Sequence, residues 1–240
     1  MIRRRGPRTP AHEYGCERCV GSRWSGSEVS GRRAGVIDHI VLAVPVLADG
    51  VAEFQRRTGI RPVMGGSHVG LGTANYLVGL GSGAYLEIIG PDPDQPDPAQ
   101  PRPFGIDDLT AARVATWCVR PPDFDAAIAA AKARGYDPGP PRAMSRRTAQ
   151  GTLLTWRLTL GAGDPVDGLV PFLIDWGTTA HPTTGTMPTL PLVSMAGEHP
   201  EPVGVRARLS ALDVGLAVRP GPRPRLLITL QCPTGSVVIS

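Results

Sequence analysis

The chain has 240 residues, enough for one large domain or two small ones, and its 41% hydrophobic content is ordinary for a globular protein. No run of eighteen apolar residues occurs, which excludes a membrane-spanning helix. The net charge of +4 comes from residues 1–35, with eight Arg and three Glu, and leaves 17 basic and 18 acidic residues elsewhere. The body of the chain therefore shows no basic excess that would indicate nucleic acid. Cys118 and Cys232 lie in apolar runs, so buried thiols and a cytoplasmic location are expected.

The N-terminal segment, residues 1–35, is rich in Arg, Gly and Ser and lacks the apolar stretch of a secretory signal. Such a composition favours a disordered basic tail. Within it, His12, Cys16 and Cys19 form an H-x3-C-x2-C cluster of the kind that binds zinc. A structural zinc ion usually takes four ligands and no second cluster follows, so disorder is the favoured interpretation.

From residue 36 onward, apolar segments alternate with glycine and proline stops. Residues 36–44 (VIDHIVLAV) are predicted to form a mostly buried strand, and residues 48–58 a helix that ends at Gly59. Three short strands follow, near residues 60–64, 74–79 and 84–89. The order of strand, helix and three strands predicts a first βαβββ module at residues 36–90.

Residues 91–112 interrupt this pattern with the run PDPDQPDPAQPRP, which cannot join a sheet and favours an extended linker. The same order then repeats in residues 113–180, with Asp123 placed to cap the helix. The predicted strand, helix and three strands lie at residues 113–119, 124–134, 143–147, 153–160 and 169–176. The repeat indicates a second βαβββ module.

Residues 181–240 form a C-terminal extension in which the order recurs over shorter elements. A strand, a helix and three strands are predicted at residues 190–195, 201–212, 215–218, 225–230 and 237–239. The last two strands are joined by a turn-like Pro-Thr-Gly segment. A third, shorter βαβββ unit is therefore predicted.

The strand DHIVLAV at residues 38–44, the helix entry Leu47-Ala48 and the strand YLEII at residues 85–89 form one pattern. They resemble the first module of the vicinal oxygen chelate superfamily, which includes glyoxalase I and extradiol dioxygenases. The segments GGSH, GTAN, PFLIDW and GEHP, at residues 65–68, 72–75, 171–176 and 197–200, are similar to its glyoxalase-like subgroup. The resemblance covers residues 36–240. It implies an α+β fold whose paired βαβββ modules curl into open half-barrel sheets around a cavity.

The resemblance also implies a divalent metal in that cavity, such as Zn, Fe, Mn or Ni, held by side chains on the first and last strands of each module. His39 and Glu87 lie at these two positions of the first module. The second module departs from the pattern, because its first strand begins with the residues VAT and offers no His, Gln or Glu. His68, in the glycine-rich segment after the second strand, is therefore the candidate third ligand.

The last strand of the second module offers Asp175 as a candidate ligand or catalytic base. When Gly90 is set against Gly177, however, Ile174 rather than Asp175 stands opposite Glu87. A shift of one residue moves a strand side chain to the other face of the sheet. A structural role as a hydrogen-bond acceptor is therefore the alternative for Asp175.

The other candidates also have structural alternatives. His39 could hydrogen-bond a core carbonyl, Glu87 could form a buried salt bridge, and His68 could be an exposed turn residue. Asn75 either orients a substrate oxygen or holds its own loop. Trp176 either lines a substrate pocket or packs in the core.

Two further groups of residues are interpreted more simply. His181 and His199 each precede a proline in a connecting segment and are interpreted as structural or exposed. Arg142, Arg146 and Arg147 form a basic cluster. Such a cluster is usually a solvated face, although it could attract an anionic substrate.

No nucleophile elbow, P-loop or dinucleotide-binding motif occurs in the sequence. The leading hypothesis is a lyase, isomerase or dioxygenase-type enzyme that acts on a small oxygenated metabolite, with a metal chelating vicinal oxygens and a carboxylate moving a proton. The main alternative is a non-catalytic protein that sequesters a small molecule. A third option is an interaction protein whose C-terminal extension fills the cavity. A homodimer is left open, because the family forms both intramolecular and domain-swapped barrels.

Overall fold

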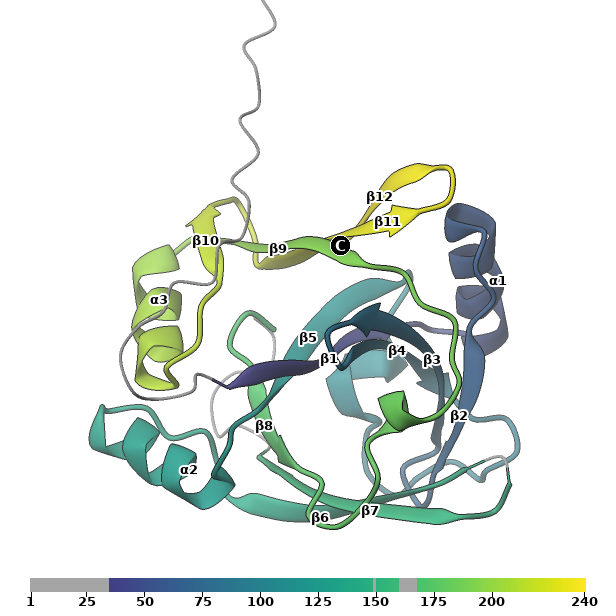
Figure 1. The fold of residues 1–240 in the computed structure, drawn as a ribbon, viewed down its shortest axis with the longest axis horizontal. Helices are drawn as coiled ribbons and strands as arrows, with labels where there is room; N and C mark the ends of the chain where they lie inside the picture. Colours follow the sequence, from purple (N-terminus) through teal and green to yellow (C-terminus); the bar gives the residue numbers. More distant parts are fainter. Residues whose placement is uncertain (1–34, 149, 160–167) are drawn as a thin grey trace, which may run out of the picture. The chain divides into compact units, whose positions relative to one another are not determined.

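The computed structural model describes residues 35–148, 150–159 and 168–240, all of which belong to one unit of the chain (Figure 1). Residues 1–34 of the predicted basic tail, with the cluster of His12, Cys16 and Cys19, lie outside the described residues. Within the described part, no helix is both long enough and apolar enough to cross a membrane.

The first module has the predicted order of elements. They are β1 (Val36–Ala43), α1 (Leu47–Thr58), β2 (Val63–His68), β3 (Thr73–Gly81) and β4 (Ala84–Pro91). β1 pairs in parallel with β4, and β3 lies between β4 and β2 in antiparallel pairing. Helix α1 ends at Gly59 as predicted, where the backbone turns left-handed with a φ of 74°.

The second strand of this module differs from its prediction. The sequence suggests a strand at residues 60–64 followed by a glycine-rich loop, whereas β2 starts at Val63 and runs through both glycines to His68. The register of β2 against β3 shifts between Met64 and Gly66. The glycines therefore accommodate an irregularity within the strand instead of ending it.

The second module also has the predicted order. Its elements are β5 (Arg113–Arg120), α2 (Phe124–Ala133), β6 (Pro141–Arg147), β7 (Leu153–Thr159) and β8 (Phe172–Asp175). Oδ1 of Asp123 accepts a hydrogen bond from the backbone N–H of Ala126 at 2.9 Å, which confirms the predicted cap of α2. The proline-rich linker contains one short 3-10 helix, η1 (Pro103–Asp108).

The two modules form one eight-stranded barrel in the order β1-β4-β3-β2-β6-β7-β8-β5. Along one seam, β1 pairs antiparallel with β5 from Val36 to Ala43. At the other seam, β2 meets β6 at the residue pair Ser67 and Arg147. The predicted α+β fold with paired, curled βαβββ sheets is confirmed, and the first two modules are the ones that pair.

We expect Gly66→Ala to open the seam between β2 and β6. Gly66 has a φ of 144°, which other residues rarely adopt, and a Cβ there would overlap the carbonyl oxygen of Arg147. The free energy of unfolding, measured with urea, should fall by about 2–3 kcal/mol. Gly70→Ala is the matched control, since Gly70 has a φ of 77° but no neighbour within 4 Å of a Cβ. It should cost about 1 kcal/mol, and equal losses in both variants would contradict the close approach at this seam.

The C-terminal unit follows the short 3-10 helix η2 (Pro182–Thr184). Its elements are β9 (Leu192–His199), α3 (Pro202–Ala211), β10 (Ala217–Pro220), β11 (Arg225–Cys232) and β12 (Gly235–Ile239). The predicted order along the chain is therefore present. The sheet order is β10-β9-β11-β12, so the first strand of this unit pairs with the second and third strands. In the first module, by contrast, the first strand pairs with the last, so the C-terminal unit is not a third copy of that sheet.

The C-terminal sheet packs on the outside of the barrel, with β11 against β5 (Figure 1). Its buried Leu226, Ile228 and Leu230 share one apolar core with Ile40 and Trp117 of the barrel strands. Among the described residues, none from 192 onward lines the cavity inside the barrel. The structure therefore contradicts the option in which this extension fills the cavity.

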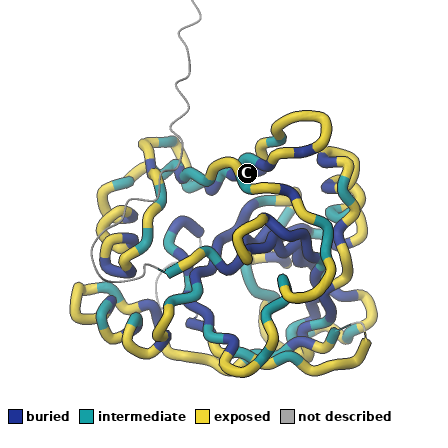
Figure 2. The backbone as a smooth tube through the Cα atoms, viewed as in Figure 1, coloured by how far each residue is buried: buried dark blue, intermediate teal, exposed yellow. Residues whose placement is uncertain are grey.

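Strand alternation divides the residues between this outer core and the cavity. On β4, Tyr85 and Glu87 line the cavity, while Leu86 and Ile88 belong to the outer apolar core. Strands β6 and β7 carry many exposed residues, whereas β1, β3 and β4 are buried along most of their length (Figure 2). The first module can thus hold polar groups away from water.

Candidate active site

A cavity of about 400 Å³ lies within the barrel. Its polar lining from the first module includes His39 on β1, His68 on β2, Asn75 on β3 and Glu87 on β4. The second module contributes a mainly apolar wall formed by Met144, Trp156, Leu158, Phe172, Ile174 and Trp176. Of the six site residues predicted from the sequence, all but Asp175 are thus brought together.

His39 is oriented by its neighbour Asp38. Nδ1 of His39 lies 2.8 Å from Oδ1 of Asp38, and both side chains are buried. The imidazole stacks on Tyr85, with ring centroids 4.9 Å apart. Since Nδ1 is engaged with a carboxylate, Nε2 is the ring nitrogen that faces the cavity, where it lies 3.8 Å from Oε2 of Glu87.

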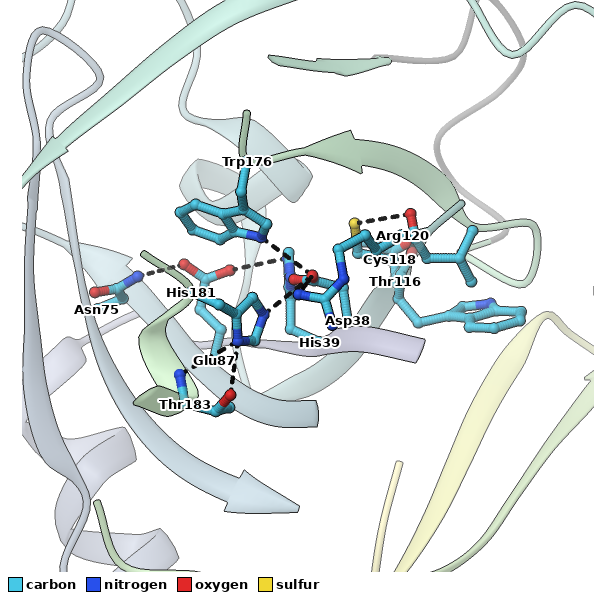
Figure 3. A network of polar contacts seen from close by, with 12 residues as sticks. Asp38, His39, Asn75, Glu87, Thr116, Cys118, Arg120, Trp176, His181 and Thr183 are labelled. Atoms are coloured by element: carbon cyan, nitrogen blue, oxygen red, sulfur yellow. Dashed lines mark hydrogen bonds and ion pairs between the residues drawn. The ribbon is translucent and has the colours of Figure 1, made fainter. Parts of the chain in front are cut away.

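Asp38 is a central residue that sequence reasoning missed. It is fully buried and accepts hydrogen bonds from Nε1 of Trp176 and Nε2 of His181, each at 3.1 Å (Figure 3). Nη1 of Arg120 lies 3.6 Å from the same carboxylate. Burial alone would raise the pKa of Asp38, but the hydrogen bonds from His181 and His39 hold it well below its usual range. The charged carboxylate therefore fixes the side chains around it.

His181 and His199 have separate places. The His181 side chain is only 10% exposed, and its ring lies edge-on to Tyr85 and Trp176, with centroids 5.6 and 5.5 Å apart. His181 donates to the carboxylate of Asp38 and is therefore structural. The alternative that it is exposed is wrong. His199 lies on β9, where its Nδ1 accepts a hydrogen bond from the backbone N–H of Glu201.

His68 is buried at the end of β2, so the exposed-turn alternative is wrong. Its Nδ1 lies 3.1 Å from Oγ1 of Thr73, and its Nε2 lies 3.7 Å from Oε1 of Glu87. Burial lowers the pKa of His68, which leaves the imidazole neutral near pH 7. A neutral imidazole with Nδ1 engaged presents an electron pair on Nε2.

Glu87 lies between the two imidazoles and is also held by an amide. Nδ2 of Asn75 donates a hydrogen bond to Oε1 of Glu87 at 2.5 Å (Figure 3). Oδ1 of Asn75 in turn accepts one from Nη1 of Arg146 at 2.8 Å. The buried carboxylate thus faces imidazole, amide and, through the amide, a guanidinium. Asn75 orients Glu87 and is part of the cavity wall, not of a separate loop.

Asp175 is the predicted site residue that the structure places elsewhere. On β8, Ile174 lines the cavity, and Asp175 is not among the lining residues. Its Oδ2 accepts a hydrogen bond from Nη2 of Arg157 at 2.7 Å, and its Oδ1 accepts one from the backbone N–H of Gly177. The alternation of one strand therefore gives Asp175 the structural role. Trp176, the next residue, does line the cavity.

We expect Asp175→Asn to leave metal and ligand binding in the cavity unchanged. The hydrogen bond from Arg157 lowers the pKa of Asp175, so the pair stabilises the fold above the ordinary carboxyl pKa of 3.8 and loses that contribution as pH falls below it. For this partly exposed pair, the variant should lose about 0.5–1 kcal/mol of unfolding free energy at pH 7 and less at pH 3. Urea denaturation at both pH values measures the difference. Impaired binding in a variant of unchanged stability would contradict this placement.

Two groups of side chains could hold a cation. Donor atoms of Asp38, His39 and Cys118 lie within 4.8 Å of one another. However, Asp38 is occupied by hydrogen bonds, and burial raises the pKa of the Cys118 thiol well above its usual value, which keeps it protonated. In the second group, the Nε2 atoms of His39 and His68 face the carboxylate of Glu87, of which one oxygen, Oε1, also accepts the hydrogen bond from Asn75. The donor chemistry of this second group fits a divalent metal.

A family model described as a glyoxalase-like domain matches residues 37–212, most of the chain. The chain belongs to the glyoxalase-like domain family. This confirms the vicinal oxygen chelate assignment that the strand around His39 and the strand around Glu87 suggest. No curated protein matches the chain.

Comparison with solved structures shows one match with a TM-score above 0.5 and weaker ones below it. A hypothetical protein from Staphylococcus aureus matches with a TM-score of 0.59 and 14% identity, over 80% of this chain and 90% of that one. Methylmalonyl-CoA epimerase from Mycobacterium tuberculosis matches with a TM-score of 0.37 and 17% identity, over 62% and 91%. The Streptomyces coelicolor methylmalonyl-CoA epimerase in complex with 2-nitronate-propionyl-CoA matches with a TM-score of 0.39 and 18% identity, over 59% and 97%.

Proposed function

We propose that this glyoxalase-like protein is a metal-dependent enzyme of the lyase, isomerase or dioxygenase type that acts on a small oxygenated metabolite. One observation carries the proposal: the Nε2 atoms of His39 and His68 lie 3.8 and 3.7 Å from the two oxygens of Glu87. Each imidazole has its Nδ1 engaged by another side chain. Such outer partners fix the orientation of metal-binding histidines.

The donor set agrees with the chemistry that this fold supports. Two imidazoles and one carboxylate suit Zn, Fe, Mn or Ni, and three protein ligands leave coordination positions open for substrate oxygens. When bound, such a cation would polarise vicinal oxygens and stabilise the negative charge that develops on them.

The residues of the chain supply the rest of the proposed chemistry. Glu87 is the one carboxylate among the described residues that line the cavity. Proton transfer to or from a substrate would therefore use Glu87, His39 or His68. Trp156, Trp176 and their apolar neighbours exclude water and pack against the organic part of a substrate. The buried, unpaired thiols of Cys118 and Cys232 support a reducing compartment, such as the cytoplasm.

Non-catalytic binding of a small molecule is the second candidate function. It is favoured by the second module, whose cavity wall is mostly aromatic and aliphatic and whose two cavity-lining charged residues are arginines, not metal ligands. A cavity of about 400 Å³ has the size of a small-molecule site whether or not a metal is held in it. Metal binding separates the two candidates.

The test is a calorimetric titration of chelator-treated protein with Zn²⁺, Mn²⁺ and Ni²⁺, and with Fe²⁺ under anaerobic conditions. The wild-type protein should bind one equivalent of at least one cation. His39→Gln and His68→Gln should each weaken that binding by about a hundredfold or more, because each removes a ligand. His199→Gln, on β9 away from the cavity, is the matched control and should bind normally. Absence of stoichiometric metal binding, or normal metal binding by both His39→Gln and His68→Gln, would contradict the proposed metal-dependent enzyme. Non-catalytic binding of a small molecule would then be the favoured function.

A further inference from the structure

Arg146 is a buried arginine in the wall of the cavity. It lies on β6, whose other residues are exposed or half-buried, yet only 4% of Arg146 is exposed. Met144 and Arg142, two and four residues earlier on the strand, line the same cavity, as strand alternation requires. Arg147 is exposed and donates to the carbonyl oxygen of Gly151. The interpretation of the basic cluster as a solvated face is therefore wrong for Arg146.

The charge of Arg146 lacks a direct counterion among the described residues. Its Nη1 donates to Asn75, while its Nε is buried with no hydrogen-bond partner. In the described part of the chain, no carboxylate lies within 4.0 Å of the guanidinium, and nothing accepts a hydrogen bond from Nη2. A guanidinium is always charged, and burying it without a counterion is costly. Nε is covered by protein atoms, so Nη2 is the nitrogen through which the guanidinium can donate a charge-assisted hydrogen bond to an anion in the cavity.

The backbone opposite Arg146 leaves room for this arrangement. A Cβ on Gly65 would collide with Nη1 of Arg146 and with Oδ1 of Asn75. Gly65 does not have a positive φ, so space rather than backbone conformation requires glycine there. The contact between Arg146 on β6 and Asn75 on β3 therefore passes over Gly65 of β2, close to the seam of the modules.

We propose that Arg146 binds the anionic group of the substrate, and that the substrate is a small carboxylic acid. This inference rests on the proposed function for the reacting end of the molecule. The chain of hydrogen bonds from Arg146 through Asn75 to Glu87 places the anion subsite beside the candidate metal ligands. A carboxylate on Arg146 would thus carry its neighbouring oxygenated carbon toward His39 and His68. Arg142 is exposed, lies on the same strand and also lines the cavity. It adds a second positive charge that attracts an anion.

Compensation of Glu87 alone does not account for Arg146. The guanidinium reaches that carboxylate only through the neutral amide of Asn75. A divalent cation on Glu87 would further neutralise the carboxylate and add positive charge to the cavity. The loaded site then needs negative charge from the ligand. A substrate carboxylate supplies it and accepts the hydrogen bond that Nη2 can donate.

The test uses three probes on metal-stripped protein: pyruvate, its neutral analogue pyruvamide, and inorganic phosphate. Trp156 and Trp176 line the cavity, so tryptophan fluorescence reports occupancy. Wild-type protein should bind pyruvate about tenfold or more tightly than pyruvamide. Arg146→Met should abolish that preference, and Arg146→Lys should retain part of it. Arg142→Met is the matched control and should weaken pyruvate binding only at low salt, because its exposed charge is screened.

The outcomes are separable. Equal binding of pyruvate and pyruvamide by wild-type protein, or an unchanged preference in folded Arg146→Met, would overturn the anion subsite. Tighter binding of phosphate than of pyruvate would overturn the carboxylate assignment. In His39→Gln and His68→Gln the preference for pyruvate should persist. Wild-type protein that prefers pyruvate but binds no metal would refute the proposed metal-dependent function alone and leave the anion subsite standing.

Discussion

Asp38→Ala is expected to lower the free energy of unfolding by about 3–5 kcal/mol, because it removes the charged partner of several buried donors. The fully buried carboxylate holds His39, His181 and Trp176, with Arg120 nearby. Without it, these donors remain buried and lose their acceptor, and a cavity replaces the carboxylate. Urea denaturation of wild-type and variant protein measures the loss.

The same residue should also affect metal binding, which a purely packing role would not. Asp38→Asn removes the charge that orients His39, and we expect it to weaken metal binding by about 10–100-fold in the folded protein. Asp49→Asn is the matched control, since Asp49 is exposed in the first turn of α1 and should change stability by less than about 0.5 kcal/mol. A stable, metal-competent Asp38→Ala protein would contradict the role assigned to this carboxylate.

Glu87→Gln should weaken metal binding more than any substitution of a residue other than the three candidate metal ligands. Loss of a ligand costs more than loss of an outer partner, so the affinity should fall by well over about a hundredfold. Glutamine has the same shape and its amide oxygen can still accept the hydrogen bond from Asn75, so the fold should persist. Calorimetric titration with the preferred cation measures the change.

Glu53→Gln provides the matched control for this substitution. Glu53 is exposed on α1 and pairs with Arg56 at the surface. Its variant should bind metal like the wild-type protein. If Glu87→Gln retains wild-type affinity while remaining folded, the buried carboxylate is held for structural reasons and His39 and His68 do not share a metal with it.

The order of elements could be predicted because local patterns specify it. Apolar runs, Gly59 after α1 and Asp123 before α2 each mark an element by chemistry within a few residues. The prediction was wrong at the glycines of β2, because glycine weakens a strand, whereas here the two glycines accommodate an irregularity and, at Gly66, a close approach. The pairing within the C-terminal sheet depends on long-range contacts and has no local signal.

Only the site residues that are determined by their position on a strand could be predicted from the sequence. His39 and Glu87 follow from their places on the first and last strands of a module, and Ile174 opposite Glu87 follows from alternation. His181 reaches Asp38 from 143 residues away, and Arg146 reaches Asn75 from 71 residues away. No pattern in one sequence reports such contacts, so the supporting network and the buried guanidinium emerge only from the fold.

Anomalous diffraction from crystals of metal-loaded protein, recorded at the absorption edge of the bound cation, tests the candidate metal site most directly. We predict one strong peak in the cavity, bonded to Nε2 of His39, Nε2 of His68 and the carboxylate of Glu87. A peak bonded instead to Asp38, His39 and Cys118, or fully loaded crystals with no peak in the cavity, would contradict this site.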